Sequence, residues 1–238
     1  MRFNKGLEKF EAPNLTEIGD DFLGYNEQLS NIEVPNVTYI GNRVLENNKE
    51  IEKFEASNVK KIGDDFLKYN EKLREFKVPN VTCIGNEVLK NNIELEKFEA
   101  PNLEWIGYSF LRNNSKLSEF KVPNVTCIGN EVLENNKSLK KIDAPNAEWI
   151  GFYFLTNNTK LSELYVPNLT KESKERLEYL FSVVKENSKE GKTQNIDSTD
   201  IAKLDKKYNI TTSEIKWSRE KTATLFNEKN NKEQGAKY

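Results

Sequence analysis

Few residues of this 238-residue chain have the type and spacing that catalysis needs. The chain has no histidine, which removes the commonest general base, the Ser-His and Cys-His nucleophile pairs and most zinc sites. Its two cysteines, Cys83 and Cys127, are not in a Cys-x-x-Cys arrangement, and no phosphate-binding glycine loop is present. The acidic pairs Asp20-Asp21 and Asp64-Asp65 are explained by capping of short turns. We therefore predict a protein that is not an enzyme and has no catalytic residues, no cofactor and no metal site.

A unit of 22 residues recurs along the chain, seven times in full and an eighth time in part. Its leading apolar position is occupied by Leu7, Leu29, Ile51, Leu73, Leu95, Leu117, Leu139 and Leu161. A period of this length is typical of a solenoid, in which each coil contacts only its neighbours. The repeat predicts one solenoid over residues 1–170, and no single globular core.

Each coil has the residue types of two short extended segments joined by turns. In the third coil Phe54 and Ala56 alternate with charged residues, which predicts a strand with these two side chains inward. Proline ends this strand in all complete coils but the third, and the Asn that follows it is typical of an Asx turn. The second segment ends in Ile-Gly, where glycine implies either positive φ or close backbone contact. The Asp or Asn after it predicts the N-cap of one helical turn.

Two further regularities predict how coils stack. One Asn occupies the same position in seven coils and can satisfy buried backbone groups of the turns: Asn26, Asn48, Asn70, Asn92, Asn114, Asn136 and Asn158. A period of two coils is also present, because Ala56 and Ala100 alternate with Val at one inward position while Phe66 and Phe110 alternate with Val at another. This alternation keeps the core volume nearly constant from coil to coil. Cys83 and Cys127 lie two coils apart, roughly 10 Å, which is too far for a disulfide, so we expect free thiols.

The repeat L-x-x-F-x-A/V-P-N-V-T-x-I-G-x-x-F/V-L-x-x-N, over about residues 7–170, resembles the leucine-rich repeats of the BspA-like type. The resemblance implies an α/β repeat solenoid: a right-handed leucine-rich-repeat superhelix with a parallel β-sheet and short helices, here about seven and a half coils plus a C-terminal helical segment. It also implies a role as a surface or adhesion module. This chain departs from the family pattern in having a coil one residue shorter, Asn in place of Cys, and Leu in place of Phe.

Charged residues alternate in sign along the outward strand positions. One row reads Lys53, Glu75, Lys97, Glu119, Lys141 and Glu163, and the adjacent row reads Glu55, Lys77, Glu99, Lys121 and Asp143. We favour a self-neutralising ladder over a charge-coded partner surface, because alternating charges cancel their own field. The net charge of −2 likewise predicts neither nucleic acid nor an anionic membrane as partner.

Aromatic residues occur where the repeat departs from its own pattern. The residue before the Ile is predicted to face outward, and in the fifth and seventh coils it is tryptophan. Our candidate partner-binding residues are Tyr39, Trp105, Tyr108, Trp149, Phe152, Tyr153 and Tyr165. Local rules tend to fail at functional sites, and exposed aromatic clusters mark protein or sugar contacts. Alternatively, these rings pack on one another or beneath the C-terminal segment.

The repeat pattern ends after Thr170. Residues 171–186 place Leu177, Leu180, Phe181 and Val184 at helical spacing, which predicts a capping helix over the last coil. Residues 187–238 read as a linker followed by a small helical or partly disordered tail. Within it, residues 204–217 resemble a helix-turn-helix of the transposase kind, which leaves nucleic-acid binding as a disfavoured alternative.

From these features we predict a non-enzymatic protein–protein interaction module that uses the solenoid surface for adhesion or host-protein binding. A protein is the favoured partner and a carbohydrate is a second option. The alternative is a structural scaffold that presents the C-terminal helical segment to another macromolecule. No run of about 20 apolar residues predicts a membrane span. No signal peptide is seen, which leaves open the cytoplasm, or the cell surface reached by another route or as a fragment.

Overall fold

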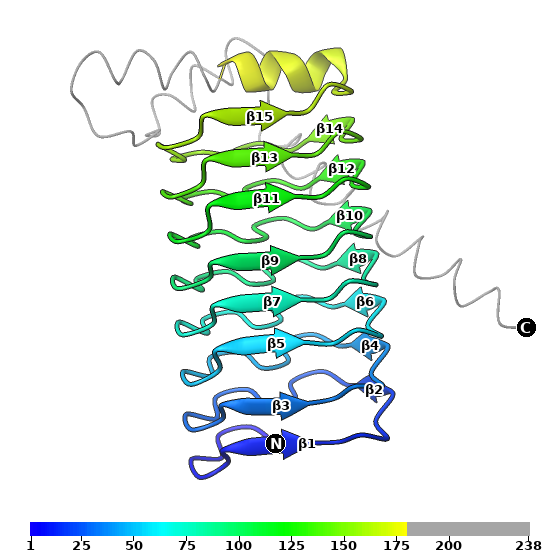
Figure 1. Ribbon diagram of the computed structural model, residues 1–238, viewed down its shortest axis with the longest axis vertical. Helices are drawn as coiled ribbons and strands as arrows, with labels where there is room; N and C mark the ends of the chain where they lie inside the picture. The colour runs from blue at the N-terminus through cyan, green and yellow to red at the C-terminus, as the bar shows by residue number, and fades with distance from the viewer. Residues whose placement is uncertain (180–238) are drawn as a thin grey trace, which may run out of the picture.

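The computed structural model describes residues 1–179, which form a solenoid of about seven coils of 22 residues with a helix at its C-terminal end (Figure 1). Each complete coil contributes one long and one short strand. The long strands are β1 (Lys9–Glu11), β3 (Asn31–Glu33), β5 (Lys53–Glu55), β7 (Glu75–Lys77), β9 (Lys97–Glu99), β11 (Glu119–Lys121), β13 (Lys141–Asp143) and β15 (Glu163–Tyr165). The short strands are β2 (Glu17–Ile18), β4 (Tyr39–Ile40), β6 (Lys61–Ile62), β8 (Cys83–Ile84), β10 (Trp105–Ile106), β12 (Cys127–Ile128) and β14 (Trp149–Ile150). The predicted parallel-strand solenoid is confirmed.

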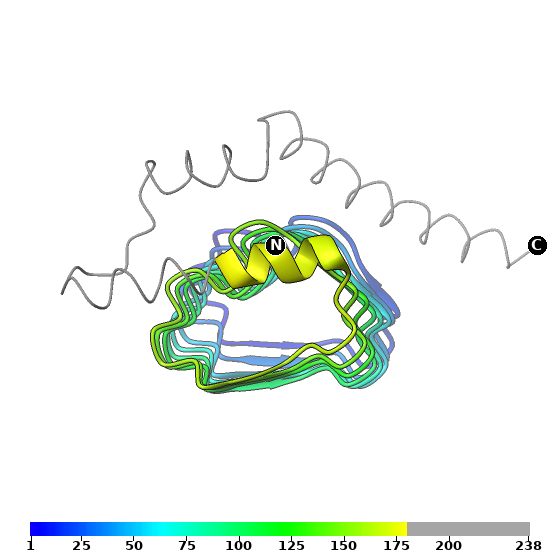
Figure 2. The same ribbon diagram turned by 90° about the horizontal axis from the view of Figure 1, so that it is seen from above.

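The two kinds of strand form two walls of different continuity. The short strands make one seven-stranded sheet from β2 to β14. The long strands fall into three sheets, β1-β3, β5-β7-β9 and β11-β13-β15. All strand pairs among residues 1–179 are parallel, and paired residues lie one coil apart, as Phe54 and Phe76 do. Seen along the axis, the coils superpose around a common interior and the helix lies across the end (Figure 2).

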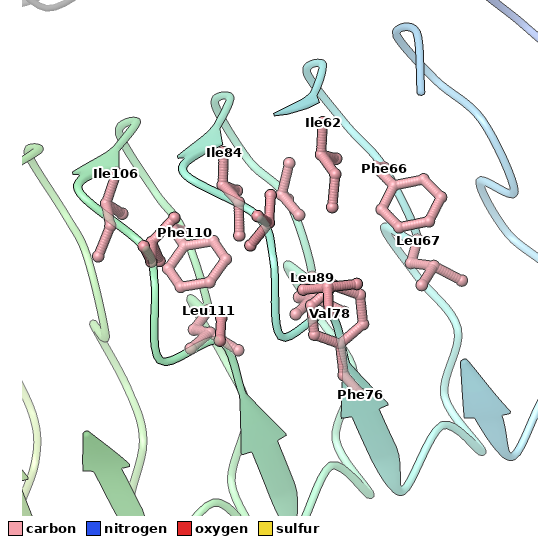
Figure 3. Packing of buried hydrophobic residues seen from close by; sticks show 14 of the residues in the cluster. Ile62, Phe66, Leu67, Phe76, Val78, Ile84, Leu89, Ile106, Phe110 and Leu111 are labelled. Atoms are coloured by element: carbon pink, nitrogen blue, oxygen red, sulfur yellow. The ribbon is translucent and has the colours of Figure 1, made fainter. Parts of the chain in front are cut away.

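Phenylalanine rings form the centre of the core, as the inward pattern predicts. Phe54 and Phe76 are buried, and their ring centroids lie 5.9 Å apart with an interplanar angle of 18°. Phe66 reaches the same stack from the turn side and meets Phe54 edge-on at 5.0 Å. Phenylalanine rings of successive coils therefore stack along the interior, and Ile and Leu side chains from the other sides of each coil pack around them (Figure 3). The Ala/Val and Phe/Val alternation lies within this core, where Val78 and Phe110 are fully buried.

The turn side of the coil contains no helical turn, which corrects the prediction for this segment. In the third coil, alternate residues Asp65, Leu67 and Tyr69 have φ of 56°, 52° and 61°. Their N–H groups bond to neighbouring coils: Asp65 to the Asn86 carbonyl at 2.8 Å and Leu67 to the Val44 carbonyl at 3.1 Å. A helical turn would satisfy these groups within the coil. The alternating backbone instead bonds coil to coil along the whole stack.

The side chains predicted to cap those turns also bond between coils. Asp64 accepts the N–H of Asn86 through Oδ1 at 2.7 Å, so the carboxylate supports the next coil. The Asn after each proline behaves likewise, since Asn102 Nδ2 donates to the carbonyl of Pro79, one coil earlier, at 3.0 Å. The predicted residue types are present at both places. Their partners are in the adjacent coil because stacking brings its backbone within reach.

The glycine after each inward Ile is required by close contact. No repeat glycine from Gly41 to Gly151 has positive φ, which removes the other explanation. A Cβ on Gly107 would lie 2.5 Å from the carbonyl carbon and oxygen of Gly85. Only glycine lets the backbones of successive coils approach this closely.

The predicted asparagine row is confirmed. Asn70 is fully buried; its N–H donates to Asn92 Oδ1 at 2.9 Å and its Nδ2 donates to the Leu45 carbonyl at 2.8 Å. Cys83 and Cys127 form no disulfide, as expected.

Residues 171–179 are helical, in agreement with the start of the predicted capping helix at 171–186. Thr170 caps its first turn, because its Oγ1 accepts the N–H of Ser173 at 3.3 Å. Leu177 packs against the core. Leu180, Phe181, Val184 and the predicted tail at 187–238 lie outside the described residues. Among residues 1–179, no helix has the length and apolar character needed to cross a membrane.

Candidate functional site

The outward row of the seven-stranded sheet varies in its first three coils and alternates Cys with Trp in the last four, unlike the rows that pack the core. In register from β2 to β14 this variable row consists of Glu17, Tyr39, Lys61, Cys83, Trp105, Cys127 and Trp149. Each residue stands beside its counterparts one coil away, so the row forms one line of side chains along the short-strand wall. It contains three of the seven candidate residues.

Exposure differs strongly within the variable row. Tyr39 is 40% exposed, Trp149 is half-buried and Trp105 is only 6% exposed. The expected exposure of Trp105 is therefore wrong. Its indole lies in register between Cys83 on β8 and Cys127 on β12, whose side chains flank it along the row.

The C-terminal helix covers Trp149 and Phe152. The Arg176 guanidinium carbon lies 4.4 Å from the Phe152 ring centre and 5.6 Å from that of Trp149, close enough for cation–π attraction. Arg176 Nη1 also donates to the Ile150 carbonyl at 3.1 Å, and Ser173 Oγ accepts the Ile150 N–H at 3.2 Å. These two aromatic residues thus pack beneath the C-terminal segment, as in the alternative stated above.

Arg176 and Ser173 were not identified from the sequence. The helical spacing of apolar residues in 171–186 pointed to a helix that docks, but this pattern gives no weight to polar side chains. A signal that could have found them is that β14 is the last strand of its sheet. The N–H and carbonyl groups on its outer edge need hydrogen-bond partners from the segment that follows.

The remaining candidates lie on different sides of the molecule. Tyr165 is 58% exposed on β15 in the long-strand wall, whereas Tyr39 stands on the short-strand wall. Tyr108 and Tyr153 are half-buried near the corner after the Gly, and the N–H of Tyr108 donates to Asn86 Oδ1 at 3.1 Å. The structure therefore does not bring the seven residues into a single patch.

Acidic groups surround Tyr39. Burial raises the pKa of its phenol, and the nearby Asp20, Glu17 and Asp64 raise the pKa further. The phenol therefore stays protonated at neutral pH, as a hydrogen-bond donor in a negative environment. Such a ring, half-exposed with a polar rim, suits contact with another macromolecule.

Opposite charges pair along the long-strand wall, as the ladder predicts. Lys97 pairs with Glu75, and Lys141 Nζ lies 3.1 Å from Glu163. A hydrogen bond from Lys97 lowers the pKa of Glu75. These pairs leave little field of one sign over β5 to β15.

The alternation fails at the N-terminal end of this wall, where the three strands β1, β3 and β5 carry Glu11, Glu33 and Glu55 in one row. A groove of about 640 Å³ opens beside them, between β3 and β5. This departure was missed because the ladder was read from Lys53 onward. No group of three or more potential metal-binding side chains occurs within residues 1–179.

Comparison with known proteins supports the family resemblance. Residues 3–118 and 82–198 match the model of the BspA type leucine rich repeat region, with six copies. A leucine-rich repeat protein from Bacteroides ovatus is similar in structure, with 16% identity, a TM-score of 0.45, and coverage of 62% of this chain and 45% of that one. A leucine rich cell surface protein from Faecalibacterium prausnitzii has 14% identity and a TM-score of 0.39, with coverage of 72% and 62%.

The chain thus spans about half the length of the first of these structures and less than two thirds of the second. No curated protein matches the sequence. The two matches to the family model overlap and together cover residues 3–198, which is more than half of the chain. The chain belongs to the BspA-type leucine-rich repeat family.

Proposed function

We propose that the protein is a non-enzymatic module that binds another protein through the variable row, with adhesion to a host or matrix protein as its use. The observation that carries the proposal is the row itself. Every row that packs the core or bonds the coils keeps one residue type or one two-coil alternation, whereas this outward row holds Glu, Tyr and Lys in the first three coils and alternates Cys with Trp in the next four. The fold does not require that variety, so the variety is available for recognition.

Leucine-rich repeat solenoids are a protein-interaction type of fold, which supports the same assignment. Tyr39 is the best contact residue, because it combines an exposed ring with a polar surround. Tyr108, Trp149 and Tyr153 are half-buried and would contribute from the flank, while Tyr165 would serve a contact on the other wall. Trp105 and Phe152 would support their neighbours from below the surface.

The test is to immobilise the full chain and measure binding to a panel of host-surface and matrix proteins. Tyr39→Ala should weaken binding of the captured protein at least about tenfold, as expected for an aromatic hot spot. Tyr69→Ala is the matched control, because Tyr69 is 39% exposed but lies on the turn side. Equal loss in both variants, or none in either, would reject the variable row. A glycan array run in parallel separates a carbohydrate-binding module from a protein-binding one.

A second candidate function is a scaffold that presents the C-terminal segment. It is favoured by the fixed position of residues 171–179, which Arg176 and Ser173 hold against β14. Under this function Arg176→Ala weakens binding of the partner and Tyr39→Ala does not. Glu178→Ala, at an exposed position of the same helix, is the control. The disfavoured nucleic-acid-binding alternative concerns residues 204–217, which lie outside the described part of the chain.

A further inference from the structure

Exposure along the variable row is lowest in the middle of the short-strand wall. Glu17 and Tyr39 at the N-terminal end are exposed, whereas Cys83 on β8 and Trp105 on β10 are only 1% and 6% exposed. β8 and β10 lie three and two coils away from β14, the strand beneath the C-terminal helix (Figure 1). Side chains alternate between the two faces of a strand, and the neighbouring Ile of each strand fills the core. The core therefore does not account for the burial of this outward row.

The neighbours within the row do not account for the burial of Trp105 either. Its indole stands between Cys83 and Cys127, roughly 4.8 Å away on each side. Both cysteines are smaller than the indole, so they flank the ring without reaching over its outer face. Trp149 gives a comparison, because the Arg176 guanidinium lies over its ring and Trp149 is still only half-buried. The more deeply buried Trp105 therefore needs a cover of its own.

The chain beyond the helix has the length and the composition to supply this cover. Residues 187–195 are polar, and most apolar residues after them fall within residues 196–226. Apolar side chains gain free energy when they leave water, and the interior of the coils is already filled. The helix lies over β14, and β10 is two coils away, roughly 10 Å. An extended peptide as long as 187–195 spans up to about 30 Å, which is more than this distance.

We propose that residues 196–226 of this chain pack against the short-strand wall over β8, β10 and β12, and so cover the middle of the variable row. This contact would continue the one that Arg176 makes with Trp149. The inference rests on the proposed binding function of the variable row and adds its regulation. A partner reaches Tyr39 at the open end directly, but it reaches Trp105 only by displacing residues 196–226.

Two reactions report on this cover in the full chain. Cys83 and Cys127 are its only cysteines, so maleimide labelling read by mass spectrometry measures how often the row opens on either side of Trp105. Oxidation by hydroxyl radicals, read in the same way, measures the exposure of the Trp105 indole itself. Both reactions should be slow in the folded parent chain relative to the same chain unfolded in urea.

Replacing apolar residues within 196–226 by serine should uncover the row. The triple variant carries Leu204→Ser, Trp217→Ser and Phe226→Ser. Both reactions should become at least about tenfold faster in it, because the segment loses the apolar area that holds it on the wall. Tyr238→Ser is the matched control, since it removes an aromatic residue outside the segment and should leave both rates unchanged. Circular dichroism checks that the solenoid is equally folded in all three proteins.

Three results would overturn the proposal. The first is equal rates in the parent and the triple variant, and the second is rapid reaction in the folded parent. The third is a rate that falls as the concentration of the parent rises, because this would show that a second copy covers the row. Slow, concentration-independent reaction in the parent with fast reaction in the triple variant supports the proposal.

This inference and the proposed function fail in different ways. If Tyr39→Ala weakens capture of a panel protein while the triple variant leaves both rates unchanged, the variable row stands and its cover is rejected. If the triple variant speeds both reactions while Tyr39→Ala has no effect on capture, the cover stands and the row is rejected as a binding surface. Where both effects are found, the triple variant should bind the panel protein at least about threefold more tightly, because no segment has to be displaced first. Unchanged binding would overturn the regulation.

Discussion

The glycine after each inward Ile cannot be replaced by a larger residue without disturbing the stacking of the coils. From the second coil onward its Cα faces the backbone of the preceding coil, and an added methyl would meet atoms that cannot move aside. Gly19 holds the same position in the first coil but has nothing within 4 Å of an added Cβ. The chain thus offers an internal comparison in which only the neighbour differs.

Gly107→Ala should lower the free energy of unfolding by about 3 kcal/mol, because it overpacks a backbone contact. Gly19→Ala should leave stability unchanged or raise it by about 0.5 kcal/mol, since alanine restricts the unfolded chain. Thermal melting followed by circular dichroism measures both. A similar loss in the two variants would show that the glycine is needed for its conformation and not for the contact.

Two half-buried glutamates on the turn side, Glu87 and Glu134, have pKa values shifted in opposite directions. Burial raises the pKa of Glu134, and the nearby Arg112 only partly opposes this. For Glu87 burial acts in the same sense, but hydrogen bonds from Lys68 and Lys90 outweigh it and the pKa is lowered. Ionisation of Glu134 therefore costs stability as the pH rises through its folded pKa. Ionisation of Glu87 adds stability that is lost as the pH falls through its own folded pKa.

At pH 7, Glu134→Gln should raise the melting temperature and Glu87→Gln should lower it. Both differences should shrink at about pH 2, where even a glutamate with a lowered pKa approaches full protonation. Melting curves of the two variants and the parent at both pH values test this. Shifts of the same sign in the two variants at pH 7 would contradict the assignment.

At the scale of the element, side-chain amides take the role that a helix or a second sheet plays in other solenoids. Each buried asparagine bonds to the coils on both sides of it. Asn70, for example, donates its Nδ2 to the Leu45 carbonyl in the preceding coil and its N–H to Asn92 Oδ1 in the following coil. Exposed asparagines after the prolines make one bond each, as Asn58 does with the Pro35 carbonyl at 2.8 Å. The two rows differ mainly in access to water.

Asn70→Ala should cost about 3 kcal/mol, because it leaves the Asn48 N–H and the Leu45 carbonyl buried without partners. Asn58→Ala should cost about 1 kcal/mol or less, because water replaces the lost amide. Denaturation by urea compares the two variants in one coil. The interpretation fails if the exposed substitution costs as much as the buried one.

The strands and the Asn row could be predicted because repetition shows which positions are held constant by packing. Phe54 and Phe76 alternate with charges, and a strand is the structure that separates them in this way. The turn side could not be predicted, because a left-handed φ at Leu67 or Tyr69 has no signal in residue type. The site was predicted only in part. Exposure of Trp105 and Trp149 depends on what lies over them, and nothing in the repeat indicates Arg176.

At the scale of the whole molecule, stability should follow the two-coil period. The first, third and fifth coils carry KFE strands with Ala and Phe inward, and the fourth and sixth carry EFK strands with Val at both inward positions. When an odd coil lies next to an even coil, opposite charges are paired across the interface and large core residues lie beside small ones. A join between two odd coils faces Lys53 with Lys97 and places Phe66 beside Phe110.

Deletion of residues 73–116 removes two coils and keeps this alternation, whereas deletion of residues 73–94 removes one coil and breaks it. In a solenoid, stability is roughly a sum over coils and their interfaces. The longer deletion should nevertheless melt at the higher temperature, because its new interface is matched. Melting curves of both proteins decide the point; a higher melting temperature for the shorter deletion would show that coil number outweighs coil matching.

The unequal continuity of the two walls gives the molecule a mechanical axis. Tension along the stack is borne by the unbroken short-strand wall, whose bonds run from β2 to β14. The long-strand wall has two interruptions, after β3 and after β9, where no strand pairing resists separation. The molecule should therefore bend most easily in one direction. In that direction the short-strand sheet stays paired, and the long strands separate at the two interruptions. A load that bends the molecule this way spreads β3 from β5 before it breaks a coil.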